Sequence, residues 1–246
     1  MITKTEAIVL RAVDYQESSL IATLFTRKDG KIAVIAKGAR RPKSKFSAFL
    51  VPGQYLEVIY YMKSTRSVQT LSDASYVQKL DRLRVDMEKM ALAVSTLEMV
   101  SQIVHENEVN EPVFHFLQNF LPWLNETENI TKKIFPYVQI RLAGLVGIGL
   151  QPEFPGGTIP EKGYINIETG SLSGEQEGEE VLPLSPAQFT FVYKSLHSAS
   201  LSILEINLTA SELSVLIEHL DKYFRYHIEG MSPRKSDTVF DQLLKD

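Results

Sequence analysis

The sequence predicts an α+β multidomain chain, in which an N-terminal five-stranded OB-fold β-barrel is followed by an α-helical domain with a small glycine-rich insertion. Three observations predict this fold class. Short runs rich in β-branched residues follow one another over residues 6–76. Beyond Lys79 the spacing of the apolar residues lengthens from that of a strand to about 3.5, which is typical of helices. The net charge changes sign at the same place, from +7 over residues 1–79 to -11 over residues 80–246.

Five runs of six to eight residues are the expected strands of the barrel, which we place at residues 1–79. They are Glu6–Arg11, Leu20–Thr26, Lys31–Lys37, Tyr55–Met62 and Ser67–Ser72. Asp29-Gly30 supplies the positive φ of a tight hairpin, and Pro52-Gly53 marks the entry to the fourth run. Five strands in about 70 residues fit an OB-fold. An SH3-like barrel has a similar pattern, and the strand count does not separate the two.

The expected helical domain spans residues 80–246. Apolar residues spaced by four and three predict one long helix from Leu83 to Val104. Further helices are expected from Pro112 to Leu124, from Thr131 to Leu145, after the cap Ser185-Pro186, and after the capping box Thr209-x-x-Glu212.

Two segments interrupt or follow these helices. Residues 151–183 are rich in glycine and are expected to form an insertion, with a small hairpin from Tyr164–Ile167 and Ser171–Leu172. The segment Ser232–Asp246 is expected to be a polar tail with one apolar patch at Val239, Phe240, Leu243 and Leu244.

The composition excludes several classes of protein and of site. Of the 246 residues 44% are hydrophobic and 23% are charged, which is typical of a soluble globular protein. No apolar run reaches the ~18 residues of a membrane span, and no signal peptide is visible, so we expect a cytoplasmic protein without membrane contact. The absence of cysteine and the spacing of the five histidines predict no metal and no cofactor. No nucleotide loop or nucleophile elbow is found, so we expect that the protein is not an enzyme.

One segment indicates binding to a polyanion. Residues 37–45 (KGARRPKSK) carry five positive charges and no negative one, in the part of the chain that is net positive. We expect Lys37, Arg40, Arg41, Lys43 and Lys45 to contact phosphates, together with Lys63 and Arg66 on a neighbouring loop. The alternative is a solvated basic loop, which for an isolated run is about equally frequent.

Aromatic residues accompany the basic run and predict base stacking. Tyr60 is the expected stacking residue, with Tyr15, Tyr61, Phe46 and Phe49 nearby in the sequence. Two alternatives stay open from the sequence. Phe46 and Phe49 can belong to the core, and only one of the adjacent residues Tyr60 and Tyr61 can point outward from a strand.

Four motifs resemble the N-terminus of the bacterial RecO recombination mediator family. They are Ala7-Ile8-Val9-Leu10-Arg11, Asp14-Tyr15-x-Glu17, Thr26-x-x-x-Gly30-Lys31, and Ala36-Lys37-Gly38-Ala39-Arg40-Arg41 with Ser44. The landmarks Arg141-Leu142, Pro152, Tyr223, His227 and Lys235-Ser236 are also similar to that family. The resemblance implies an OB-fold and a helical domain in a nucleoid-associated bacterial protein of DNA damage repair and recombination. It also implies binding to single- and double-stranded DNA, strand annealing, and loading of RecA, together with RecR, on DNA covered by single-stranded-DNA-binding protein.

The chain departs from that family at the insertion. Many RecO-like proteins carry a four-cysteine zinc module between helices, whereas here Gln151-Pro152 is followed by Glu153-Phe154 and three residues without a metal ligand. We therefore expect residues 151–183 to be a degenerate, metal-free form of that module.

The resemblance further implies docking of the acidic C-terminal tail of single-stranded-DNA-binding protein. Such a tail requires a cation beside an apolar slot. Lys133, Tyr137 and Arg141 stand four residues apart on the third expected helix and so share one side, which makes them the expected tail site. The alternative is that Arg141 packs between helices while the lysines are solvated.

Two other functions fit the residues themselves. An RNA-binding OB-fold module has the same cationic and aromatic surface, because RNA and DNA both offer phosphates and bases. A protein-interaction scaffold would instead act through the helical domain. Competition between matched DNA and RNA strands separates the first alternative from the DNA-binding hypothesis.

Overall fold

The computed structural model describes residues 1–154, 160–176, 178–198, 200–237, 240 and 242. The chain forms two compact units. The first contains Met1–Asn129 and the segment that begins at Arg234, and the second contains Ile130–Pro233. The first unit therefore holds both the barrel and several helices. The expected domains, 1–79 and 80–246, were divided where strands give way to helices, and the compact units are divided elsewhere.

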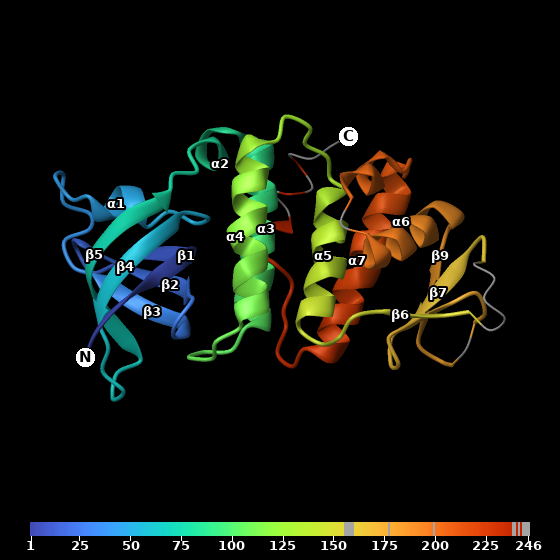
Figure 1. The fold of residues 1–246 in the computed structure, drawn as a ribbon, viewed down its shortest axis with the longest axis horizontal. Coiled ribbons are helices and arrows are strands. Elements are labelled where there is room, and N and C mark those ends of the chain that lie inside the picture. The colour runs from blue at the N-terminus through green and yellow to red at the C-terminus, as the bar shows by residue number, and fades with distance from the viewer. Residues whose placement is uncertain (155–159, 177, 199, 238–239, 241, 243–246) are drawn as a thin grey trace. The chain divides into compact units, whose positions relative to one another are not determined.

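The N-terminal strands close into a barrel in the order β1-β2-β3-β5-β4 (Figure 1). β1 pairs antiparallel with both β2 and β4, and β3 pairs with β5 in parallel. This closure confirms the predicted OB-fold. The strands are β1 (Ile2–Tyr15), β2 (Ser19–Thr26), β3 (Gly30–Ala36), β4 (Tyr55–Tyr61) and β5 (Val68–Gln78).

β1 is longer than the expected run Glu6–Arg11, because one strand pairs with two neighbours. Its first half, from Ile2 to Ile8, pairs with β4, and its second half, from Ala7 to Tyr15, pairs with β2. The register shifts between Val9 and Arg11, which is a β-bulge. A bulge bends a strand, and this one allows β1 to turn from one neighbour to the other.

The β2–β3 connection requires glycine at its end. Gly30 has φ +66°, so the predicted positive φ is confirmed. A Cβ atom at this position would lie 2.0 Å from the carbonyl oxygen of Glu108, in the loop that precedes α4. The hairpin and this loop therefore approach each other through a gap that only glycine fits.

The first unit also contains the short helices α1 (Phe46–Phe49) and α2 (Arg82–Val85) and the longer α3 (Met87–Ile103) and α4 (Glu111–Glu126). The expected single helix from Leu83 to Val104 is wrong, because the chain breaks at Asp86. Asp86 has extended backbone, and its carboxylate accepts hydrogen bonds from the amides of Glu88 and Lys89 at 3.0 and 3.1 Å. It therefore caps the N-terminus of α3.

Where α4 packs on the barrel, apolar side chains fill both the barrel interior and the contact between the barrel and the helix. The interior of the barrel is filled by alternate side chains of the strands, for example Leu24, Val34 and Val58. Outside the barrel, the rings of Phe25 and Tyr55 contact Phe114 of α4, with centroids 5.6 and 6.5 Å apart. α4 thus covers one sector of the barrel's outer surface.

The segment after Pro233 is not the expected polar tail. Arg234, Ser236 and Phe240 are buried, and the amide and hydroxyl of Ser236 donate to the Glu98 carboxylate of α3 at 2.9 and 2.7 Å. The amide of Lys235 donates to the same carboxylate at 3.1 Å. The other members of the expected apolar patch, Val239, Leu243 and Leu244, lie outside the described residues.

The second unit packs helices against a small sheet of order β6-β8-β7-β9. The expected hairpin is confirmed, because Tyr164 and Ile165 pair with Ser173 and Leu172. The insertion shares its core with the helices. The elements are α5 (Ile134–Leu145), β6 (Gln151–Glu153), β7 (Gly163–Asn166), β8 (Ser171–Ser173), β9 (Val181–Leu184), α6 (Pro186–His197), the 3₁₀ helix η1 (Leu201–Glu205) and α7 (Ala210–His227).

Side-chain caps begin α6 and α7 of this unit. Ser185 and Gln188 form a capping box at α6, and Thr209 and Glu212 form the predicted one at α7. Glu212 also accepts a hydrogen bond from the Ser185 hydroxyl at 2.5 Å, which joins the two helix starts. Among the described helices, none combines the length and the apolar character that crossing a membrane requires.

Candidate nucleic-acid interface

The predicted basic run forms a loop, Lys37–Lys45, that leaves the barrel at the end of β3; we call it the basic loop. Gly38 begins it with φ +70°. Ala39 is fully buried in the barrel core and so fixes the loop, and the amide of Arg40 donates to the carbonyl of Ser18 at 2.9 Å. The loop is therefore anchored at two points on the barrel.

The five cations of the basic loop are all exposed but differ in their surroundings. Arg40 lies 3.1 Å from Asp14, and Lys45 lies 2.5 Å from Asp73 and lowers the pKa of that carboxyl. Within the part of the chain that the structure describes, no carboxylate lies within 4.0 Å of the other three, which are Lys37, Arg41 and Lys43. These three offer the loop's uncompensated positive charge.

The expected stacking residue Tyr60 is a wrong prediction. Its side chain is fully buried in the barrel core, and its hydroxyl donates to the Asp29 carboxylate. Burial and this hydrogen bond raise the pKa of Tyr60. The neighbouring Tyr61 points outward instead and is 46% exposed.

Lys63 and Arg66 were expected on a loop next to the basic loop. The structure contradicts this expectation. Both are exposed in the β4–β5 loop, residues 62–67, which precedes Val68. Val68 is paired with Ala33 of β3. Ala33 stands four residues before Lys37, so at least about 13 Å of strand separates the two loops. Figure 1 shows the segment before α1 and the β4–β5 loop at opposite ends of the barrel.

The two phenylalanines after the basic loop are only half-exposed. Phe46 and Phe49 pack against the barrel core, and the Phe49 ring meets Tyr76 edge-on at 4.8 Å. The alternative that these rings belong to the core is therefore the correct one.

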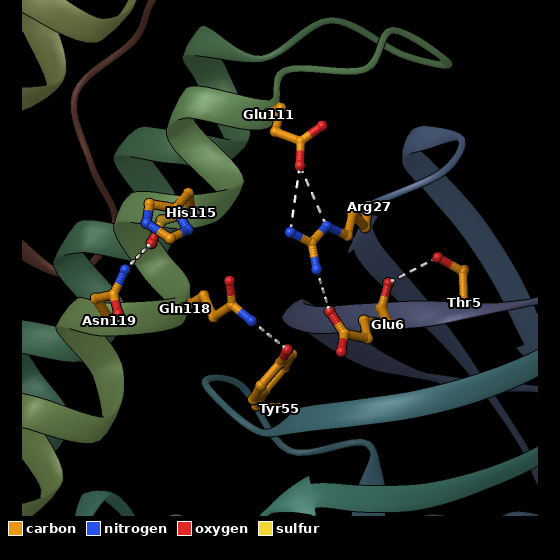
Figure 2. Close-up of polar contacts among 8 residues, drawn as sticks. All are labelled: Thr5, Glu6, Arg27, Tyr55, Glu111, His115, Gln118 and Asn119. Carbon is orange, nitrogen blue, oxygen red and sulfur yellow. Dashed lines mark hydrogen bonds and ion pairs between the residues drawn. The ribbon is translucent and has the colours of Figure 1, made fainter.

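Other cations of the barrel are used to hold α4, the end of α3 and the loop between these two helices. Arg27 lies between Glu6 of β1 at 3.0 Å and Glu111 of α4 at 3.2 Å (Figure 2). Hydrogen bonding to Glu111 is the main cause of the raised pKa of Arg27. Lys31 donates to the carbonyl of Ser101 at 2.7 Å. Positive charge in this part of the sequence is thus partly structural.

A hydrogen bond reinforces the same contact. Figure 2 shows Gln118 of α4 directed toward Tyr55 of β4, to whose hydroxyl it donates at 2.7 Å. Burial raises the pKa of Tyr55 to about 12, so this hydroxyl stays protonated at neutral pH. The two residues hold α4 to the barrel without using a charged group.

The residues of the expected tail site lie in the second unit. Lys133 donates to the carbonyl of Ile206 at 2.9 Å, and burial lowers its pKa. Tyr137 is half-buried and packs against the core of that unit. Arg141 is half-buried on α5, and in the described part of the chain no carboxylate lies within 4.0 Å of it. Lys133 is therefore engaged within the fold, whereas Arg141 has no ion pair with any residue that the structure describes.

The described residues hold no group of three or more histidine, cysteine or acidic side chains that could bind a metal ion. At the position of the insertion, two side chains of α7 hold backbone carbonyls instead. The Tyr223 hydroxyl donates to Ile148 at 2.8 Å, and a ring nitrogen of His227 lies 2.7 Å from the Ile167 carbonyl oxygen.

Comparison with known proteins decides the family. The model "Recombination protein O N terminal" matches residues 1–80, and "Recombination protein O C terminal" matches residues 84–237. This chain belongs to the RecO family. The predicted resemblance is therefore confirmed, and with it membership of a family of DNA repair proteins.

Three relatives named "DNA repair protein RecO" illustrate the similarity. The one from Salinibacter ruber is 42% identical over 60% of this chain and 56% of its own length. Those from Chloroherpeton thalassium and an Exiguobacterium species are 30% and 29% identical. These two matches cover 99% and 100% of this chain, and 100% and 98% of the relatives.

Proposed function

We propose that this RecO protein binds DNA through the basic loop and anneals complementary strands during recombinational repair, without catalysing a reaction. The observation that carries the proposal is the set of three exposed cations, Lys37, Arg41 and Lys43, which no described carboxylate compensates. A phosphate backbone is the polyanion that such a loop suits, because each contact releases counterions from the nucleic acid.

The mechanism is neutralisation of charge. Two DNA strands repel each other through their phosphates, and cations on a protein surface lower this repulsion. Contacts to phosphates leave the edges of the bases free, since backbone contacts position a strand without reading its sequence. Strands held in this way can pair on the protein.

The partners belong to the same proposal. By its family membership, the protein would act with RecR to load RecA on single-stranded DNA covered by single-stranded-DNA-binding protein. It would do so in the bacterial cytoplasm, associated with the nucleoid. These partners would meet the protein outside the basic loop, because that loop is occupied by DNA in the proposed state.

Arg141 is the residue that best supports a tail site. A half-buried guanidinium beside the half-buried Tyr137 can hold a carboxylate next to an apolar surface. Losing one charge-assisted contact costs about 1.5–3 kcal/mol, so Arg141→Ala should weaken the binding of an acidic tail peptide by more than about tenfold. Lys194→Ala, which removes an exposed lysine of α6, serves as the matched control. Equal affinity in both variants would move the tail site elsewhere.

The function is tested by an annealing assay without ATP, with and without the cognate single-stranded-DNA-binding protein. The variant Arg41→Ala/Lys43→Ala should anneal more slowly than the wild type. The control Lys194→Ala/Arg225→Ala removes the same charge from exposed positions of the second unit and should anneal like the wild type. Equal rates in all three proteins would refute annealing by the basic loop.

Competition between matched DNA and RNA strands separates the proposal from an RNA-binding function. A clear preference for RNA would favour the RNA-binding module. Unchanged repair in cells that carry only the Arg41→Ala/Lys43→Ala variant would favour a scaffold that acts through protein contacts.

A further inference from the structure

Part of the barrel's outer surface is not covered by the described helices of the first unit. α4 covers the sector around Phe25 and Tyr55, which are buried. Elsewhere on the outside, Val13, Tyr15 and Tyr61 remain 37%, 40% and 46% exposed. Large apolar and aromatic side chains that stay exposed together on one surface often mark a binding site.

The strand register places several of these side chains in one row. Directly paired residues of neighbouring strands point to the same face of a sheet. Val13 is paired with Ile21, Ile21 with Ile35, Ile35 with Thr70, and Thr70 with Tyr61. We call this set the outer row. It crosses all five strands, and four steps of ~4.8 Å give it a length of about 19 Å along the barrel surface.

The sequence neighbours of the outer-row residues show that the outer-row side chains point away from the barrel core. Ala22, Val34 and Leu71 precede or follow members of the outer row and lie in the barrel core. The members themselves are half-exposed or exposed. The row is therefore the outward face of the sheet.

The outer row connects the two cationic loops. One end, Val13, precedes Asp14, whose carboxylate pairs with Arg40 of the basic loop. The other end, Tyr61, stands two residues before Lys63 of the β4–β5 loop. Phosphates held at both loops would carry a strand along the row. At about 3.4 Å per stacked nucleotide, the ~19 Å row holds about five, within the range of about 4–16 nucleotides that an OB-fold binds.

We propose that the outer row is a base-stacking platform, on which Tyr61 supplies a ring face for an unpaired base, and that it makes the protein bind single strands more tightly than duplexes. The inference rests on the proposed DNA-binding function and adds that the preferred ligand is an unpaired strand. In a duplex the base faces are stacked on one another and only edges are accessible, whereas an unpaired base offers its whole face. The basic loop would hold the phosphates of either form, and only unpaired strands would use the row.

The test compares three ligands of equal length: a thymidine oligonucleotide, an abasic strand with the same phosphates, and a duplex. Stacking is worth about 1–3 kcal/mol per base, so Tyr61→Ala should raise Kd for the thymidine strand about 5- to 150-fold. Kd for the abasic strand and for the duplex should stay within about twofold, because their phosphate contacts are unchanged.

Two conservative variants and one control sharpen the test. Tyr61→Phe keeps the ring and should bind like the wild type, while Tyr61→Leu keeps apolar area without a ring and should resemble Tyr61→Ala. Tyr226→Ala removes an exposed tyrosine of α7, in the second unit, and should change nothing. Thermal melting of each variant shows that the barrel is folded.

The outcomes separate this inference from the proposed function. An unchanged thymidine Kd in Tyr61→Ala, with weaker binding in Arg41→Ala/Lys43→Ala, overturns the platform and leaves DNA binding by the basic loop intact. Equal losses on all three ligands in Tyr61→Ala also overturn it, since the ring would then act without bases. Unchanged binding in Arg41→Ala/Lys43→Ala refutes the proposed function itself.

Discussion

Removing Arg41 and Lys43 together probes the basic loop most directly, because neither side chain has an ion pair with a described residue that its loss would break. Both are exposed, and no described carboxylate lies within 4.0 Å of either. Arg40 is less suitable, since its guanidinium pairs with Asp14 at 3.1 Å and donates to the carbonyl of Gln16 at 3.4 Å. A loss of affinity in the double variant therefore reports contacts with DNA.

The expected magnitude follows from counterion release. Each phosphate contact on a single strand contributes about -0.7 to the slope of log K against log salt concentration. Losing two contacts should make the slope about 1.4 less steep. The ratio of variant Kd to wild-type Kd should consequently fall about sevenfold between about 50 mM and about 200 mM salt.

Fluorescence anisotropy with a labelled single strand over a series of salt concentrations gives these slopes. Lys194→Ala/Arg225→Ala, with the same loss of charge in the second unit, should keep the wild-type slope. Arg40→Ala should change the slope by less than about 0.7, because its guanidinium is already partly neutralised. An unaltered slope in Arg41→Ala/Lys43→Ala would show that the basic loop is only a solvated surface.

Three further predictions concern stability. Gly30→Ala should lower the free energy of unfolding by more than about 1 kcal/mol, and by more than the control Gly147→Ala does. Both glycines have positive φ, but of the two only Gly30 would place a Cβ against backbone atoms. Equal losses of the two variants in urea unfolding would contradict this. Glu98→Ala should cost about 1–3 kcal/mol in the same assay, since it leaves the donors of Ser236 and its neighbour without their acceptor. Hydrogen bonds lower the pKa of Glu212, so its stabilisation is complete at neutral pH and is lost as the pH falls through the folded-state pKa. The difference in Tm between wild type and Glu212→Gln should therefore shrink on acidification, and a constant difference would refute it.

The sequence predicted the barrel well because its signals are local. Alternating apolar residues, Asp29-Gly30 and Pro52-Gly53 all act within a few residues, and the structure has strands and turns at these places. The helix break at Asp86 was missed because Leu83 is buried on the same spacing as the apolar residues of α3. Apolar spacing alone does not report where backbone hydrogen bonds stop.

The choice between Tyr60 and Tyr61 could have been made from alternation, because Leu56, Val58 and Tyr60 lie in the barrel core and the polar Glu57 has the same outward parity as Tyr61. The pairing of β4 with β5 shifts between Ile59 and Tyr60 by passing over Ser72, so the irregularity lies in β5 and leaves the alternation of β4 intact. A bulge is a property of two paired strands, and one strand's sequence does not reveal it. The outer row became visible only when the register of all five strands was known.

The charge of the N-terminal part illustrates a second limit of sequence. Its excess of cations predicts a polyanion-binding surface, but Arg27 is paired with Glu111, 84 residues away in the chain. Lys31 is likewise taken up by the end of α3 and the loop that follows. Each pair of this kind removes a cation from the surface that DNA can reach. The functional charge is therefore part of what the fold leaves unpaired among the described cations, which besides Arg11 and Lys28 include three cations of the basic loop and those of the β4–β5 loop. These two loops lie near the two ends of the outer row, so in the proposed state a strand bound at both would run along the row to Tyr61. Charge and stacking would then act on the same strand, the first holding any phosphate backbone and the second selecting the unpaired state that annealing consumes.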